Sequence, residues 1–481
     1  MEVDYEYRVD VTRTTISGTL DTPELKDRRF EPVTVREDDE ERRLLLATID
    51  VLRKWLNRWT ALIRVSEQDE YAELPVRNTS TVLGQHLYAT IFIGQVREGF
   101  NVARRSAAAA GATLRLLLRF DGSAVELAQF PWELLYADGE FLAKEHRLVL
   151  SRSLLPGGRV RTVPQEPPLK VRFLVTLPDS DAYREQRVNL LTALRQPDEY
   201  STKIDSDILD RWSEDKAAAM LSADCPHVVH IVGVCRRRRN RDGGDAMQIY
   251  LDDGVEARWR SPQVLVNLFR DNEKLVPADR VRLVVLHLCE PSPLDFEVTF
   301  ERLAPDLIGC GIPTVLAMQY PLSGNAAGRF VKMLYQELAG TKTIEEAVQD
   351  ARSDLFTQVE DDLGFGSPLL YMQSIDSQLL IRQGTAAGAD AGPSSVSTTQ
   401  APPRSTLEWL LQQLDGVKEP VQARGDVGQI LRKLDPWPPQ LPDVERRLSR
   451  QARAYAYRAD LARVFLALVK LVQAQLEVRD G

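Results

Sequence analysis

The sequence predicts an α/β protein with a largely parallel sheet flanked by helices, an N-terminal β-plus-helix extension and a small C-terminal all-α domain. Several apolar runs are nearly continuous in Val, Ile and Leu, which is typical of central parallel strands covered on both faces. Helical segments lie between these runs, in the order that a parallel sheet requires. The length of 481 residues and the 43% apolar content predict about two to four compact units.

Residues 1–80 are predicted to form the N-terminal extension. Apolar residues alternate from Val3 to Val11, the period of a half-buried strand, and polar turn-forming residues follow until about residue 38. From Glu40 to Val65 the apolar residues recur at alternating steps of four and three. This spacing lays one stripe on a helical face. Because the stripe lasts under three heptads, it favours a packing helix over a coiled coil.

Residues 81–384 are predicted to form the main α/β domain. The predicted strands are Leu114–Phe120, Val171–Leu177, His227–Val234, Arg282–Leu288 and Pro313–Met318. The predicted helices between them include Pro262–Arg270, Phe296–Ile308, Ala326–Ala339 and Thr343–Phe356.

A flexible linker is predicted at residues 385–404, because this stretch holds almost no residue that could anchor a core. Residues 405–481 then read as a separate helical domain, with 12 basic and 10 acidic residues. This balance argues against a nucleic-acid module. A tethered helical domain of this size is typical of protein interaction and recruitment, and the alternative is a cap that docks on the α/β domain.

Composition excludes several classes of function. The chain has 61 Lys and Arg against 70 Asp and Glu, a net charge of −9, so no global basic field attracts nucleic acid or an anionic membrane. No apolar run approaches the roughly 18 to 20 residues of a membrane span, and the acidic first ten residues lack the layout of a signal peptide. We therefore expect a cytoplasmic protein that binds neither nucleic acid nor membrane.

Cysteine and histidine are scarce. The chain has four cysteines and five histidines, and no two cysteines form a CxxC pair, which argues against a zinc cluster and a disulfide framework. The sequence also lacks a phosphate-binding P-loop, an HExxH pair and a Rossmann fingerprint. We expect no metal and no cofactor.

Two predicted strand ends can present reactive groups, since side chains at the carboxyl ends of parallel strands meet at one rim of the sheet. The first is His227–Cys235, where Gly233 permits a tight exit and the next side chain projects over the edge. The second is Val281–Glu290, which places Cys289 at the same rim.

Several motifs resemble the CHAT domain, a family of the caspase-like clan of cysteine peptidases found beside TPR proteins and in prokaryotic conflict systems. The similarity runs from about Gly84 to about Leu380. It rests on motifs in the family's order and spacing, namely Leu114–Arg152 with Phe130-Pro-Trp-Glu-Leu-Leu135 at its centre, Cys289-Glu290, Phe300–Ile308, Gly311–Tyr320 and Thr343–Arg352. The resemblance implies a caspase-like fold for residues 81–384.

The resemblance also implies a catalytic dyad, in which a histidine ending one strand deprotonates or positions a cysteine ending the next. Cys289 stands at the nucleophile position. Val234 replaces the family histidine, and an isopropyl group transfers no proton. His230 matches a histidine four residues upstream, about 13 Å below the rim at the rise of a strand. His287 lies two residues before Cys289 on the same strand face, about 6.6 Å along the backbone, and is the one candidate for a substitute base.

Cys235 is a further accessory candidate, because the arginines that follow it would lower the pKa of its thiol and favour oxidation or a disulfide with Cys289. We expect the arginine run Arg236–Arg239, with Arg241, to form a solvated loop. Its alternatives are a docking site for an acidic partner and a cleavage site for a trypsin-like relative.

Three functional hypotheses remain open from the sequence. In the first, the chain is a pseudo-peptidase that acts as a regulatory or binding component of a prokaryotic, and specifically bacterial, conflict or signalling system. In the second, it is a cysteine endopeptidase that uses Cys289 with a non-standard or partner-supplied base. In the third, it is a scaffold that recruits a protein partner through residues 405–481. The first is favoured, with protein partners at the helical domain and at the degenerate cleft.

Overall fold

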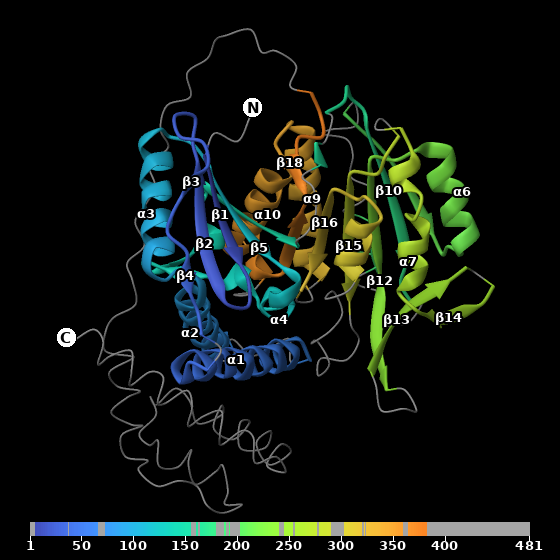
Figure 1. The fold of residues 1–481 in the computed structure, drawn as a ribbon. Coiled ribbons are helices and arrows are strands. Elements are labelled where there is room, and N and C mark those ends of the chain that lie inside the picture. The colour runs from blue at the N-terminus through green and yellow to red at the C-terminus, as the bar shows by residue number, and fades with distance from the viewer. Residues whose placement is uncertain are drawn as a thin grey trace, which may run out of the picture. The chain divides into compact units, whose positions relative to one another are not determined.

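A computed structural model gives the fold (Figure 1). The residues it describes are 5–36, 38–65, 73–154, 160–161, 164–178, 187–188, 192, 203–239, 245–253, 255–276, 279–289, 303–319, 322, 324–358 and 364–381. The chain divides into two units, Met1–Gln383 and Gly384–Gly481. The predicted linker and helical domain lie outside the described residues, as do the strand position Val3 and the start of the predicted helix at Phe296.

The first unit is built on one mostly parallel sheet with the order β11-β10-β12-β15-β16-β17-β8-β5-β1-β2-β3. All neighbours from β11 to β16 and from β17 to β1 run parallel, whereas β16–β17 and β1–β2 are antiparallel. Its strands are β1 (Tyr5–Val11), β2 (Thr15–Asp21), β3 (Arg28–Arg29), β5 (Leu114–Phe120), β8 (Leu148–Leu154), β10 (Leu169–Thr176), β11 (Ile204–Asp210), β12 (Val228–Arg239), β15 (Leu283–Cys289), β16 (Thr314–Met318) and β17 (Pro368–Met372).

Shorter strands lie off this path. β4 (Val33–Thr34) pairs with β2, and β13 (Asp245–Asp252) pairs with β12 and with β14 (Ala257–Arg260). Two further pairs stand apart, β6 (Tyr136–Ala137) with β7 (Glu140–Phe141) and β9 (Val160–Arg161) with β18 (Ser374–Asp376).

The helices are α1 (Glu40–Val65), α2 (Glu73–Ile91), α3 (Gly94–Ala109), α4 (Val125–Ala128), α6 (Glu214–Asp224), α7 (Gln263–Leu268), α8 (Leu303–Gly309), α9 (Gly324–Ala339) and α10 (Ile344–Gln358). Short 3₁₀ turns, η2 to η6, lie at Gly122–Ala124, Trp132–Leu134, Leu142–Lys144, Asn272–Lys274 and Gly364–Gly366. The predicted helix Glu40–Val65 is confirmed with the same bounds.

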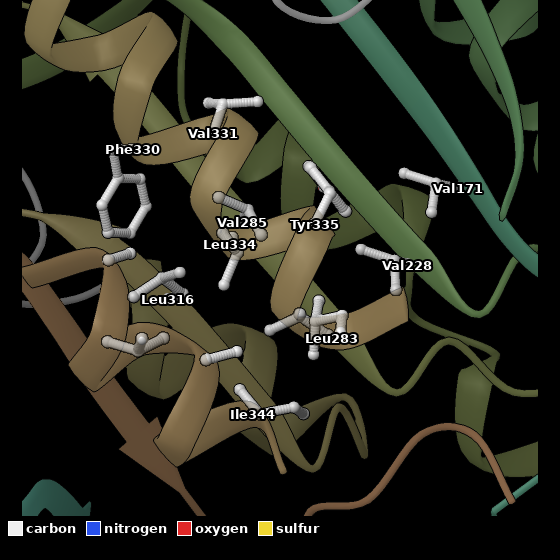
Figure 2. Close-up of a cluster of buried hydrophobic side chains, with 14 of the residues drawn as sticks. Val171, Val228, Leu283, Val285, Leu316, Phe330, Val331, Leu334, Tyr335 and Ile344 are labelled. Atoms are coloured by element: carbon white, nitrogen blue, oxygen red, sulfur yellow. The ribbon is translucent and has the colours of Figure 1, made fainter. Parts of the chain in front are cut away.

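Two apolar clusters cover the two faces of the strands from β10 to β16. One cluster packs alternate strand residues against α9 and α10, and Figure 2 shows Val285 beside Leu334 of α9 and labels Val171, Val228 and Leu283 in the same cluster. The other packs the intervening strand residues against α6, α7 and α8. Burial on both faces explains why these strands read as continuous apolar runs rather than as alternating ones. The prediction of a largely parallel sheet flanked by helices is confirmed.

The N-terminal strands extend the same sheet. β1 pairs in parallel with β5 through the register Glu6↔Arg115 and Asp10↔Arg119. Residues 15–21 are not the turn that the polar composition predicted, because they form β2, antiparallel to β1. Ile16 and Leu20 are buried on alternate positions of β2, and Gly18 between them leaves room for the ring of Tyr7, whose hydroxyl would lie 2.0 Å from an added Cβ.

The predicted loop after Cys235 is also wrong. β12 continues to Arg239 and forms an antiparallel hairpin with β13 from Cys235↔Ile249 to Arg239↔Asp245. This segment has no apolar period because the strand leaves the core there. Backbone pairing with β13, rather than burial, maintains this part of β12. Among the described helices, none is long and apolar enough to cross a membrane.

Candidate functional site

The two segments singled out by the sequence lie on neighbouring strands of the sheet. β12 and β15 pair in parallel, and Val234 is the register partner of Cys289. One residue pair earlier Gly233 faces Leu288, and before that Val232 faces His287. Since neighbouring strands lie about 4.8 Å apart, the structure brings together the two positions that the resemblance assigns to a dyad, although 55 residues separate them in the chain.

Val234 is a core residue of β12. It is 1% exposed and belongs to the apolar cluster under α9 and α10. The tight exit expected at Gly233 is wrong, because β12 runs on past this residue. A Cβ at Gly233 would lie 3.0 Å from Thr176 Cγ2 and 3.3 Å from Leu288 Cδ2. Glycine therefore suits a close approach between three strands, and no proton-transferring side chain stands at position 234.

His287 lies on the strand that ends at Cys289, and it is 1% exposed. Neither ring nitrogen has a hydrogen-bond partner among the residues that the structure describes, and burial lowers the pKa of this imidazole to about 4. The ring is therefore neutral near pH 7. Its lone pair can in principle accept a proton, but a base this weak takes up little of the charge that thiol deprotonation would place on it.

His230 is a core residue that contacts neighbouring side chains. It is fully buried, its Nδ1 lies 3.0 Å from the Tyr335 hydroxyl of α9, and its ring stacks on that of His287 with centroids 6.0 Å apart. Burial, followed by the nearby His287, lowers the pKa of His230 well below its usual value. In register His230 faces Val285, four residues before Cys289, which agrees with the position predicted below the rim.

Cys235 lies on the other side of the sheet. It follows Val234 in a strand, so its side chain points to the opposite face, where it is buried in the cluster under α6, α7 and α8. Cys289 occupies the register position beside Val234, not beside Cys235. This placement gives no support to a disulfide between the two cysteines. Cys225 and Cys310 are half-buried elsewhere.

A comparison with protein families decides the assignment. The model of the CHAT domain matches residues 81–410, more than half of the chain. The chain belongs to the CHAT domain family. No curated protein matches its sequence.

Two solved structures are similar to this CHAT protein. A chain of the Saccharomyces cerevisiae separase–securin complex aligns with 10% identity and a TM-score of 0.43, over 76% of this chain and 30% of that chain. The Arg-specific cysteine proteinase gingipain R aligns with 10% identity and a TM-score of 0.35, over 62% and 71%. This chain thus spans less than a third of the separase chain that it matches, and the similarity assigns no activity to it.

The sequence did not reveal one buried ionic cluster of the CHAT domain. Glu133, in the Phe130–Leu135 motif, is fully buried and pairs with Arg152 of β8, whose Nε lies 3.1 Å from Glu133 Oε1. Arg352 of α10 lies 4.0 Å from the same carboxylate, and Gln319 donates to it at 2.9 Å. Buried charges of this kind persist when they are paired and hydrogen-bonded.

The arginines of the cluster also donate hydrogen bonds to backbone carbonyl oxygens around it. Arg152 Nη1 donates to Ala128 O at 2.8 Å, and Arg352 Nη2 donates to Pro368 O at 2.6 Å. Burial lowers the pKa of Arg352 to about 10, partly offset by Glu133. The cluster therefore joins three of the motifs that carried the resemblance. Two features of the sequence could have signalled this cluster. Glu133 is a lone charged residue in the apolar motif Phe130–Leu135, and Arg152 is the charged residue of strand β8.

No group of three or more His, Cys, Asp or Glu side chains that could hold a metal ion occurs within the described ranges.

His227, at the start of the first segment singled out by the sequence, has a structural role. Its Nδ1 accepts from the Lys170 amide at 3.0 Å and lies 2.6 Å from Gln165 Nε2, and burial lowers its pKa to about 3.

Proposed function

We propose that this CHAT domain is a pseudo-peptidase that binds or regulates a protein partner. One observation carries the proposal: Val234, a buried aliphatic residue, is the register partner of Cys289 on the neighbouring strand. A thiol with a pKa near its usual value, about 8.5, is mostly protonated at neutral pH, and a base normally converts it into the nucleophile. With valine in that place, the site keeps the position of the nucleophile without the group that activates it.

The surrounding imidazoles support the same interpretation. His230 contacts Tyr335 and His287, and both imidazoles are buried with pKa values below the usual range. Loss of a general base costs on the order of 100- to 10,000-fold in rate. The proposed role is therefore binding, in a bacterial conflict or signalling assembly of the kind in which the family occurs, and in the cytoplasm.

A thiol-directed peptide probe tests the proposal. Because Cys225 and Cys310 are half-buried rather than fully buried, the variant Cys225→Ala/Cys310→Ala serves as the background that removes unspecific labelling. We expect a peptide acyloxymethyl ketone to label Cys289 no faster than it labels free cysteine. Stoichiometric labelling that disappears in Cys289→Ala, together with turnover of a peptide, would overturn the pseudo-peptidase.

The second candidate is a cysteine endopeptidase whose base is His287. It is favoured because neither nitrogen of this ring has a hydrogen-bond partner within the described part of the chain, since an imidazole nitrogen that already accepts a hydrogen bond is less able to accept a proton. This candidate expects Cys289-dependent turnover that His287→Ala abolishes. It also expects a rate that rises with pH through about 4. Turnover that persists in His287→Ala would eliminate it.

We also propose that residues 405–481 recruit a protein partner, which would make the chain a scaffold as well. The support is the composition of the predicted linker before them. Deletion of residues 405–481 followed by affinity co-purification tests this role. The proposal expects at least one partner to disappear, and an unchanged set of partners would contradict it.

A further inference from the structure

A three-stranded ribbon extends β12 beyond the candidate site. β12 pairs with β13, and β13 pairs with β14 from Ile249↔Arg260 to Asp252↔Ala257. Within the described strands, β13 is the one neighbour of β14. Figure 1 shows β13 and β14 beside the far part of β12. The other edge of β14 therefore offers backbone N–H and C=O groups in the arrangement that accepts a further strand.

The ribbon is basic in an acidic protein. Between residues 235 and 261 the sequence has seven arginines and five acidic residues, whereas the whole chain carries −9. On β14 itself, Ala257, Arg258 and Arg260 are exposed and Trp259 is half-buried. Arg258 forms an ion pair with Glu256, and Arg260 extends from the same face two residues on. This face of the edge strand is suited to carboxylates.

The opposite face of the ribbon carries a fixed guanidinium. The Arg236 guanidinium lies 3.9 Å from the centre of the Trp259 ring, and its Nε and Nη2 donate to Gln248 Oε1 at 3.1 and 3.0 Å. Trp259 packs edge-on against Tyr250 and rests on the cluster that contains Val234. Arg236 follows Val234 by two residues on the same strand face. The ribbon is thus continuous with the candidate site.

We propose that β14 binds an acidic, extended segment of a partner protein as an additional strand. Alternate side chains of such a segment would be carboxylates facing Arg258 and Arg260, and the residues between them would be apolar and lie toward Trp259. The proposal rests on the pseudo-peptidase function and specifies the chemistry of its partner. The arginine-rich segment Arg236–Arg239 would then form the strand of the ribbon that pairs with β13.

Binding is measured by fluorescence anisotropy with the full chain carrying Cys289→Ala, so that any peptidase activity is removed. The probe is a fluorescein-labelled peptide of alternating glutamate and valine. We expect saturable binding that weakens as salt rises, because the contacts are between exposed charges. We expect Arg258→Glu/Arg260→Glu to weaken binding about tenfold or more, and Trp259→Ala to weaken it severalfold. Unchanged binding in the double variant would overturn the proposal.

The matched control reverses two exposed arginines away from the ribbon. Arg105→Glu/Arg147→Glu changes the net charge equally, and both side chains are exposed, so binding is expected to stay the same. An equal loss in this control would mean that net charge alone attracts the peptide, which overturns the proposal.

Two further probes separate strand addition from general anion binding. A peptide of the same charge with proline at the alternate positions cannot donate the ladder hydrogen bonds, and we expect it to bind at least severalfold more weakly. A single-stranded oligonucleotide of equal charge should compete poorly. Equal binding of the proline peptide, or equal competition by the oligonucleotide, would overturn strand addition.

These experiments separate the two proposals. Peptide turnover by the unmodified chain would refute the pseudo-peptidase and leave the Cys289→Ala binding measurement valid. Absent peptide binding would refute the β14 site and leave the labelling experiment valid.

Discussion

The two halves of the central sheet bury polar side chains in different ways. In the half with β1, β5 and β8, buried charges are paired, as Glu133 is with Arg152 and Arg115 is with Glu345. In the half with β12 and β15, the buried polar groups beside the candidate site are neutral imidazoles with few partners. The Phe130–Leu135 motif thus serves packing in one half, while in the other half the buried aliphatic residue Val234 lies beside Cys289.

Removal of the Glu133 charge from the buried ionic cluster should destabilise the protein more than any other change considered below. Glu133→Gln keeps the volume of the side chain but leaves Arg152 and Arg352 without their buried counter-charge. Because an uncompensated buried charge is strongly destabilising, we expect the free energy of unfolding to fall by about 3 to 5 kcal/mol. Urea denaturation followed by tryptophan fluorescence measures this change.

The matched control is Glu126→Gln on α4, an exposed position seven residues earlier. Its effect should stay within about 0.5 kcal/mol, as is usual for surface substitutions. If Glu133→Gln also cost less than about 1 kcal/mol, the buried cluster would not be what holds the motif to β8 and α10.

The second prediction concerns how stability depends on pH in the half of the sheet that holds the buried imidazoles. The pKa of His287 falls from 6.5 to about 4 on folding, so below pH 6.5 the unfolded chain takes up a proton that the folded chain does not. The stabilisation is complete above that pH and is lost as pH falls toward 4. A shift of this size corresponds to a loss on the order of 3 kcal/mol for one fully buried group.

Paired denaturation curves at pH 7 and pH 4 isolate this effect. His287→Leu should lose less stability over this interval than the unmodified chain, because the leucine takes up no proton in either state. The exposed residue His146 provides the control, His146→Leu. An identical pH dependence in His287→Leu and the unmodified chain would show that His287 is not buried as a neutral group.

The smallest effect separates a partly buried ion pair from an exposed one. Asp10 and Arg119 are register partners on β1 and β5, with Asp10 Oδ2 and Arg119 Nη2 2.7 Å apart and both side chains about a quarter exposed. A double-mutant cycle with alanine should give a coupling energy of about 0.5 to 1 kcal/mol.

The exposed pair of Arg36 and Asp38 is the comparison for this cycle, since both side chains are about four-fifths exposed. No measurable coupling is expected there. Equal coupling in the two pairs would mean that the β1–β5 register adds nothing to the interaction.

The sequence predicted the parallel core well and the polar clusters poorly. Strands such as Leu114–Phe120 are found with the predicted bounds because burial on both faces leaves a continuous apolar signal. The partners of Glu133 lie 19 residues away at Arg152 and much farther along the chain at Arg352, and the pattern of a single segment carries no information on such long-range pairs.

The candidate site was predicted in part for a similar reason. The valine at position 234 could be read directly against the family motif, and the resemblance implied that the strand of Cys289 is the next one, as the parallel pairing of β12 with β15 has it. The continuation of β12 into the ribbon could not be predicted. Its arginines have no apolar period, and what they contact, such as the Trp259 ring under Arg236, comes from a strand about 20 residues later.

Peptide turnover distinguishes a pseudo-peptidase from an active cysteine peptidase. A degenerate peptide pool is incubated with the unmodified chain and with Cys289→Ala, and cleavage products are quantified by mass spectrometry. The absence of a base at position 234 predicts the same background of products from both proteins. Cleavage by the unmodified chain that is lost in Cys289→Ala would contradict the pseudo-peptidase and establish an active cysteine peptidase.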